Sequence, residues 1–182
     1  MMVPERLSLL TFDVFIEVNP TPCAREIIVD FKTMETGVMT LELEPFAIGK
    51  YAVTNEQYHR FLLETGYLPR CHDEFDRAGF LTHWGEGRRP PEQKRDHPVT
   101  SVSFVDALAC AVFVGGRLPT YYEWLYAAYG NTSRRYPWGE TFSLERCNVR
   151  ESGIGDTTPV GRFSPEGDSR TGCCDMLGNV WE

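Results

Sequence analysis

Six cysteines are the residues of this sequence best suited to redox or metal chemistry. They are Cys23, Cys71, Cys110, Cys147, Cys173 and Cys174. Thiolates are the soft ligands that copper(I) prefers, so the adjacent pair at 173 and 174 is the first candidate, although neighbouring cysteines do not easily direct both sulfurs to one metal. No CxxC pair indicates structural zinc, and the spacing is too irregular for a disulfide scaffold. We expect most of these thiols to be reduced and packed, with Cys173 and Cys174 serving as small buried hydrophobic residues.

Other familiar catalytic arrangements are not readable in the sequence. The four histidines, His59, His72, His83 and His97, never recur at a metal-ligand spacing such as HxxxH. No serine or cysteine is followed by a recognisable base, and no glycine-rich phosphate loop occurs. The residues alone therefore name no catalytic group.

Length and charge narrow the class of protein. The chain has 182 residues, of which 42% are hydrophobic, enough for one domain core. Its net charge of -8 repels polyphosphate and anionic membrane, so we expect neither nucleic acid nor a membrane as a partner. Acidic residues interrupt the first twenty positions, and no apolar run approaches the ~18 residues that span a bilayer. We expect a cytoplasmic protein.

Three helix starts share one capping pattern, a Thr or Ser followed three residues later by a side chain that can return its hydrogen bond. The pairs are Thr54/Gln57, Ser103/Asp106 and Thr120/Glu123. They predict helices over Asn55 to about Thr65, Phe104–Val114 and Tyr121–Tyr129, each followed by glycine. The second predicted helix is apolar almost all round, which favours a place inside the domain.

Strand patterns precede the helices. Phe12, Val14, Ile16 and Val18 alternate as on one strand face, and Ile27 to Phe31 is expected to pair back as a hairpin after the turn at residues 19–22. Leu41 to Ile48 is a further strand candidate. We therefore expect an N-terminal strand or hairpin extension over residues 1–40 and the main domain over 41–182. Residues 70–98, and all those after 130, are expected to form long loops.

A series of short motifs follows this framework in a fixed order. They are Phe46–Asn55, His97–Val99, Val102–Ala107, Arg117–Thr120, Glu123-Trp124, Tyr136–Gly139, Thr158–Gly161 and Asp175–Glu182. In this order they resemble the formylglycine-generating enzyme, or sulfatase-modifying factor, family over about residues 40 to 182. Trp124 and Trp181, within these motifs, are expected to fill the loop-rich half of the core.

The resemblance implies an α+β, C-type-lectin-like fold with little regular secondary structure. It also implies ancestry in the copper-dependent oxidation of a sulfatase cysteine to formylglycine. In that family the copper-binding cysteine pair lies beyond the Gly-Asn-Val-Trp-Glu motif, and this sequence ends within it, at Glu182. We therefore expect a domain incomplete at its C-terminus, with copper only in a missing segment and no activity in the chain as given.

The resemblance further implies calcium sites, because hard cations bind oxygen ligands supplied by loops. One ion would be held by the Asp175 and Glu182 side chains and the Gly178 and Val180 carbonyls. A second would use Asn148 with the carbonyls of Val149 and Ile154. The family usually has acidic residues where Ser152 and Ala52 stand, which weakens the second site. The alternative is that Asp175 and Asn148 only cap turns.

Two kinds of function stay open at this point. One is an oxidase of the formylglycine-generating type. The other is a non-enzymatic, ligand-binding module such as the variable proteins of diversity-generating retroelements, which use the same scaffold. Departures from the usual family pattern slightly favour the second, at Phe104, Phe113, Tyr121, Tyr122 and Leu125. Either reading predicts a protein or peptide ligand.

Overall fold

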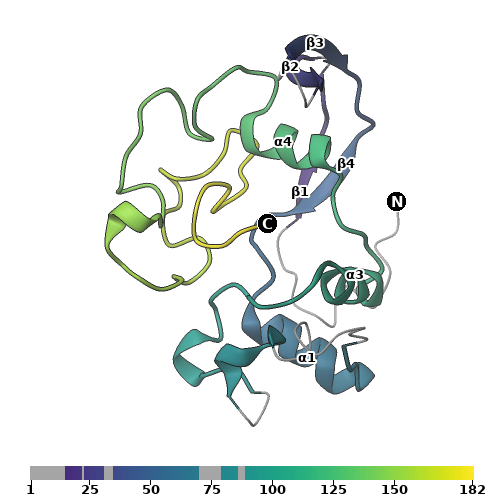
Figure 1. Ribbon diagram of the computed structural model, residues 1–182, viewed down its shortest axis with the longest axis vertical. Coiled ribbons are helices and arrows are strands. Elements are labelled where there is room, and N and C mark those ends of the chain that lie inside the picture. The colour runs from purple at the N-terminus through teal and green to yellow at the C-terminus, as the bar shows by residue number, and fades with distance from the viewer. Residues whose placement is uncertain (1–14, 22, 31–34, 70–78, 86–88) are drawn as a thin grey trace.

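The computed structural model describes residues 15–21, 23–30, 35–69, 79–85 and 89–182. Helices α1 (Asn55–Thr65) and α3 (Phe104–Phe113) lie together at one end of the molecule (Figure 1). Helix α4 (Tyr121–Tyr129) lies beside strands β1 (Phe15–Val18) and β4 (Phe46–Gly49), and the chain after α4 forms long loops on the other side of that helix. In the described part of the chain, short 3-10 helices interrupt the loops: η2 (Thr82–Trp84), η3 (Glu92–Lys94) and η4 (Arg150–Ser152).

The strands pair differently from the predicted hairpin. β1 pairs antiparallel with β4, with Phe15 opposite Gly49 and Val18 opposite Phe46. Strand β2 (Cys23–Asp30) pairs antiparallel with β3 (Glu35–Leu41), a strand that the sequence did not predict. The predicted pairing of the first strand with residues 27–31 is therefore wrong, because a more distant segment supplies its partner. Phe12 and Val14 lie outside the described residues.

All three predicted helix starts are confirmed. The side chains of the N-cap residues Thr54, Ser103 and Thr120 each accept a hydrogen bond from the third helical N–H, and the backbone N–H of each N-cap residue donates to that third residue's side chain. Such boxes satisfy backbone donors that a helix leaves unpaired at its start. Gly66 ends α1 in the left-handed conformation, where glycine meets no Cβ clash.

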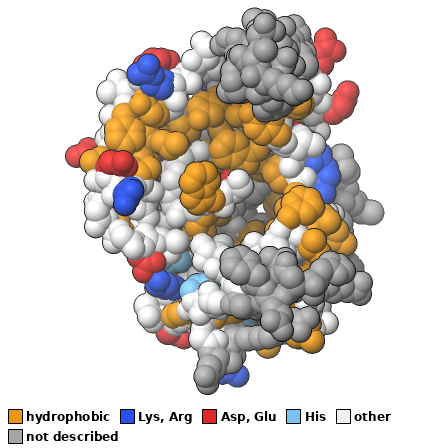
Figure 2. Space-filling model, in the orientation of Figure 1, with side chains coloured by type: hydrophobic (Ala, Val, Ile, Leu, Met, Phe, Trp, Pro, Cys, Tyr) orange, Lys and Arg blue, Asp and Glu red, His pale blue; other side chains and the backbone are white. Residues whose placement is uncertain are grey.

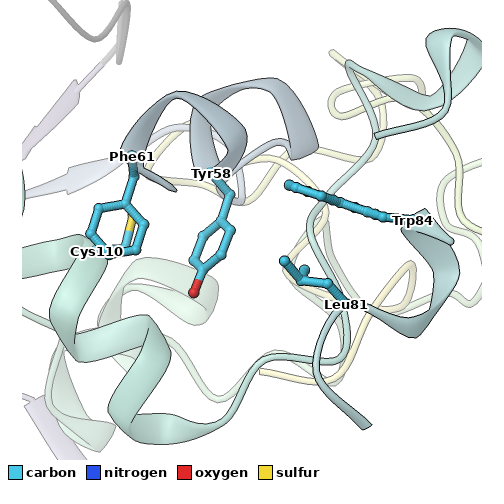
Figure 3. Packing of buried hydrophobic residues seen from close by; sticks show 5 residues of the cluster. All are labelled: Tyr58, Phe61, Leu81, Trp84 and Cys110. Carbon is cyan, nitrogen blue, oxygen red and sulfur yellow. The ribbon is translucent and has the colours of Figure 1, made fainter. Parts of the chain in front are cut away.

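The helical end of the molecule encloses an aromatic core (Figure 3). Tyr58 and Phe61 of α1 pack edge to face at 5.3 Å between ring centroids. Cys110 of α3, Leu81 and Trp84 complete the buried cluster. Rings offset in this way add to the stabilisation that burial alone supplies. Leu81 and η2 are thus anchored to the two helices.

A second core holds α4 between the strands and the loops. On one side Tyr126 packs with Val18 of β1 and with the side chains of β4. On the other, Ala127 and Ala128 are fully buried against Cys173 and Met176. The two alanines allow the loop backbone to approach the helix closely. Helix α4 therefore fixes the position of the segment that contains the candidate site.

Two burial predictions are wrong. Helix α3 lies on the surface and not inside the domain, since the side chains of Phe104 and Val112 are 71% and 62% exposed. Trp181 is fully exposed and does not fill the core, whereas Trp124 is half-buried and packs against the α4 cluster. Within the described residues, no helix has both the length and the apolar character needed to cross a bilayer.

Candidate functional site

The last ten residues of the chain form a loop that folds back on the rest of the molecule. The Cys174 N–H donates to the carbonyl of Lys50 at 2.8 Å, which ties the loop to the end of β4. Asp175 and Asn179 both have left-handed backbone conformations, at φ 56° and 64°. Asp and Asn tolerate this region better than most residues, so the turns suit their sequence.

Asp175 places a carboxylate inside this loop. Its Oδ2 accepts a hydrogen bond from the Gly161 N–H at 2.7 Å. Gly161 itself has φ 71°, and an added Cβ there would lie 2.6 Å from the ring of Tyr51. Burial raises the pKa of the Asp175 carboxyl above its ordinary value, opposed by the Gly161 bond, and the charge of Asp168 raises it further.

Glu182 brings a second carboxylate close to the first. It accepts a hydrogen bond from the indole N–H of Trp124. Loss of water around the carboxyl raises the pKa of Glu182, and the charge of Asp175 raises it further. Glu182 as a whole residue is exposed, so the loss of water is confined to its carboxyl group. A carboxyl that has lost water and lies in the field of another carboxylate is an environment that a cation would stabilise.

The other two predicted ligands of this ion are backbone carbonyls. The Gly178 carbonyl already accepts a hydrogen bond from the Val180 N–H at 2.8 Å. A Cβ at Gly178 would lie 2.3 Å from the backbone oxygen of Asn148, so only glycine fits there. Among the described residues no group of three or more His, Cys, Asp or Glu side chains gathers. Any ion here therefore needs backbone oxygens, as the prediction has it.

The structure also brings together parts of the second predicted site. Asn148 is buried, and its Oδ1 accepts from the Ser152 hydroxyl at 3.2 Å. The same hydroxyl donates to the Val149 carbonyl at 2.6 Å. The single hydroxyl proton of Ser152 is thus shared between two of the predicted ligand oxygens, with the shorter contact to Val149. Ile154, the third predicted ligand residue, lies at the surface in the loop after η4.

Asn179 is a structural hub that the sequence reasoning missed. Its Oδ1 accepts from the Thr158 N–H at 2.8 Å and from the Asn148 amide at 3.2 Å. Its Nδ2 donates to the Thr158 carbonyl at 3.1 Å, and its own N–H donates to the Asn148 carbonyl at 2.7 Å. The available signal was an Asn directly after a glycine in the last motif, a pair typical of turns.

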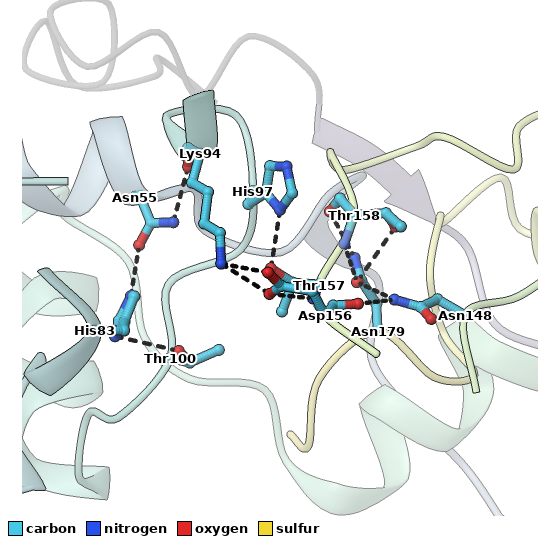
Figure 4. A network of polar contacts seen from close by, with 10 residues as sticks. All are labelled: Asn55, His83, Lys94, His97, Thr100, Asn148, Asp156, Thr157, Thr158 and Asn179. Atoms are coloured by element: carbon cyan, nitrogen blue, oxygen red, sulfur yellow. Dashed lines mark hydrogen bonds and ion pairs between the residues drawn. The ribbon is translucent and has the colours of Figure 1, made fainter. Parts of the chain in front are cut away.

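This hub continues into a polar network that reaches the helical end of the molecule (Figure 4). The Asn148 amide donates to the Asp156 carbonyl, and the Asp156 carboxylate binds Lys94 at 2.6 Å. The Lys94 carbonyl accepts from the side chain of Asn55, the first residue of α1. The network therefore joins the loops after α4 to the start of α1.

Comparison with known proteins now decides the family. Residues 19–182 match the family model described as the sulfatase-modifying factor enzyme 1-like domain. The chain belongs to this family. The prediction made from the ordered motifs is therefore confirmed over nine-tenths of the sequence.

Relatives in the sulfatase-modifying factor family carry two kinds of name. The formylglycine-generating enzyme of Thermomonospora curvata is 33% identical over 194 aligned positions, 81% of this chain and 62% of that protein. The inactive C-alpha-formylglycine-generating enzyme 2 of Bos taurus is 31% identical over 196 positions, 84% of this chain and 64% of that protein. The chain thus spans less than two thirds of the length of either relative.

A solved structure supports the fold. PvdO from Pseudomonas aeruginosa aligns with a TM-score of 0.62 and 21% identity, covering 91% of this chain and 67% of that one. The small strand pairs, the helices α1, α3 and α4 and the long loops of the described residues fit the α+β, C-type-lectin-like fold that the family resemblance implied. The fold prediction is confirmed.

The cysteines with described side chains do not fit the copper pair of the sulfatase-modifying factor family. Cys173 and Cys174 are buried, and the Cys174 thiol donates to Asp168 at 3.0 Å. Burial raises the pKa of Cys174 to about 12, and that of Cys110 to about 12 as well. Burial likewise raises the pKa of Cys147 and Cys173. Copper(I) needs thiolates, so these packed thiols are unsuited to it.

Proposed function

We propose that this protein is the scaffold of a formylglycine-generating enzyme family member that binds a protein or peptide containing a cysteine. The proposed activity is oxidation of that cysteine to formylglycine, with copper held outside the described thiols. The names of the curated relatives support this activity. We propose the cytoplasm as its location.

We further propose that calcium stabilises this scaffold at Asp175 and Glu182. The observation that carries this proposal is a loop that holds two carboxyls whose pKa values are both raised by burial, with the charge of Asp175 also raising the pKa of Glu182. A divalent cation between the two carboxyls would supply positive charge that compensates for their lost hydration. Both carboxyls would then stay ionised. The Gly178 and Val180 carbonyls would complete its oxygen shell. The Asn148 site, with Val149 and Ile154, would bind more weakly, because Ser152 supplies no charge.

Thermal melting with calcium and with chelator tests the first site. Calcium at about ten times its dissociation constant should stabilise the wild-type chain by about 1.4 kcal/mol, because only the folded state presents the loop. The variant Asp175→Asn should lose this gain, and the matched control Glu140→Gln, at an exposed loop position, should keep it. Equal melting of wild type in calcium and in chelator would show that the site does not bind.

A second experiment separates an enzyme from a binding module. The inactive bovine relative shows that sequence identity near 30% accompanies either outcome. Because the described cysteines are packed thiols, the 182-residue chain should form no formylglycine on a sulfatase-motif peptide with copper(I) and oxygen. Mass spectrometry of the peptide is the readout. Detection of the aldehyde would contradict this assignment of the cysteines. Peptide binding without conversion would favour the module.

A further inference from the structure

The loop after α4 encloses a cavity that none of the candidate metal sites uses. Its volume is about 300 Å³, at the small end of the range for pockets that hold organic ligands. The lining side chains are one indole, two carboxylates, one guanidinium and two hydroxyls: Trp138, Glu140, Thr141, Ser143, Glu145 and Arg146. Figure 2 shows hydrophobic, acidic and basic side chains interspersed over the loops after α4, on the left of the molecule.

Backbone and ring contacts fix the shape of this cavity. The backbones of Tyr136 and Gly139 exchange two hydrogen bonds, at 2.9 and 3.0 Å, and the Trp138 indole N–H donates to the Thr141 carbonyl at 3.0 Å. The Trp138 ring also stacks on Tyr136, with 5.8 Å between centroids and 9° between planes. The indole is therefore held in place before any ligand arrives, and few groups would need ordering on binding.

The charged side chains of the cavity lack a charged partner in the described part of the chain. Glu140, Glu145 and Arg146 take part in none of its ion pairs. The two acids are exposed, whereas Arg146 is half-buried. The Arg146 backbone is held against Gly167, where an added Cβ would lie 2.3 Å from the Arg146 carbonyl oxygen. Two carboxylates that accept hydrogen bonds and a guanidinium that donates them are thus available to a ligand.

The mixed charge of the lining narrows the class of ligand. Two carboxylates disfavour an anion, the half-buried guanidinium disfavours a simple cation, and an apolar ligand would leave all three groups without partners. A free amino acid would depend on ion pairs with exposed side chains, which contribute little. A sugar is neutral, and its hydroxyls both donate to carboxylates and accept from a guanidinium. The C–H face of a sugar ring also packs on an indole.

We propose that this cavity binds one pyranose ring of a saccharide, with the ring packed on Trp138 and its hydroxyls bound by Glu145 and Arg146. The cavity reaches Trp138 but not Tyr136, so the indole meets it on a side that the stack with Tyr136 leaves uncovered. The site is open and holds a single ring, so its dissociation constant lies in the millimolar range. A free sugar and the end of a longer glycan present the same ring.

Saturation-transfer difference NMR of the full chain tests the site. The probes are glucose, galactose, mannose and N-acetylglucosamine at about 10 mM, each as the free sugar and as its methyl glycoside. At least one sugar should receive saturation at its ring C–H protons. Binding of both forms would indicate the end of a glycan, because the methyl group stands for the next ring, and binding of the free form alone would indicate a free saccharide.

Variants of the lining connect this signal to the cavity. Glu145→Ala and Arg146→Gln should each weaken binding by about three- to tenfold, the contribution of one hydrogen bond, with melting temperatures near that of wild type. The matched control Glu151→Ala removes an exposed acid of η4 outside the cavity and should bind like wild type. Absence of saturation transfer to every sugar would overturn the proposal. So would sugar binding that Glu145→Ala and Arg146→Gln leave unchanged, or a response to free arginine or glycine without any to the sugars.

Discussion

At the residue scale, Asn179 matters more for stability than its place in an irregular loop suggests. Its side-chain amide makes hydrogen bonds to both the N–H and the carbonyl of Thr158, and also to the side chain of Asn148. A side chain that replaces main-chain partners in a loop satisfies groups that would otherwise be buried without partners. This explains the position of an asparagine between Gly178 and Val180.

Replacing this amide should therefore be costly. Asn179→Ala should lower the free energy of unfolding by about 2 to 4 kcal/mol, because it leaves buried groups of Thr158 and Asn148 unpaired. Urea denaturation provides the measurement. The control Asn131→Ala removes one bond of an exposed asparagine to Thr21 and should cost about 0.5 kcal/mol or less. Similar losses in the two variants would contradict the hub.

The Asp175 carboxyl should make stability depend on pH when calcium is removed. Its pKa is raised in the folded state, chiefly by burial. The folded chain therefore holds this proton more tightly than the unfolded chain, and this stabilisation is lost as pH rises through the raised pKa. Asp175→Asn keeps an acceptor for Gly161 and tolerates the left-handed backbone, but it does not ionise.

We expect Asp175→Asn to gain stability relative to wild type as pH rises from about 4 to 7, by on the order of 1 kcal/mol. The measurement is urea denaturation in chelator at several pH values. Glu140→Gln serves again as the exposed control and should track wild type. A constant difference between Asp175→Asn and wild type at every pH would rule out this titration.

At the element scale, the start of α4 combines a capping box with an ion pair. The Glu123 carboxylate accepts from the Thr120 N–H at 2.7 Å and binds Arg117 through both oxygens, at 2.6 and 2.8 Å. The Arg117 bond is the main reason that the pKa of Glu123 falls to about 2. The segment leading into α4 is thus fastened to the helix that contacts both the strands and the loops.

Acid should weaken this connection. Because the pKa of Glu123 is lower in the folded chain, its ionised carboxylate stabilises the fold at pH values above the ordinary pKa of 4.5. This stabilisation is lost as pH falls toward 2. Glu123→Gln should cost about 2 kcal/mol at pH 7, and the difference from wild type should nearly vanish at pH 2. Urea denaturation at both pH values measures it. Glu64→Gln, which removes the exposed pair with Arg60, should change stability by about 0.5 kcal/mol or less.

At the scale of the whole molecule, two cores are connected by polar contacts. Cys110 belongs to the helical core, and Cys173 belongs to the core around α4. Besides the Lys94–Asp156 pair, the Val160 N–H donates to the Asp96 carbonyl at 3.0 Å across this junction. Buried thiols in both cores can report whether the two halves unfold together.

We expect Cys110, Cys147, Cys173 and Cys174 to resist thiol reagents at pH 7 and to react at one common rate as urea unfolds the chain. Burial excludes the reagent and raises the pKa of each thiol. Peptide mass spectrometry after pulsed labelling identifies each site. Earlier reaction of Cys173 and Cys174 than of Cys110 would show instead that the half of the molecule around α4 opens on its own.

Local sequence patterns predicted the helices α1, α3 and α4, their caps and the packing of the cysteines with described side chains. These features depend on local chemistry, because a capping box needs only residues three positions apart and a glycine ends a helix wherever its neighbours are. The ordered motifs also identified the family. Such features do not require knowledge of which distant segments meet.

Local patterns could not predict features that arise from distant contacts, namely the strand pairs, the burial of each helix side and the partners of Asn179. β1 pairs with β4, which lies far from it in the sequence. The alternation of apolar residues in β1 is compatible with many partner strands, so it does not identify β4. The apolar composition of α3 predicted burial, yet one side alone contacts the core. Whether an apolar side chain is covered depends on which surfaces pack against it, and composition does not record that packing.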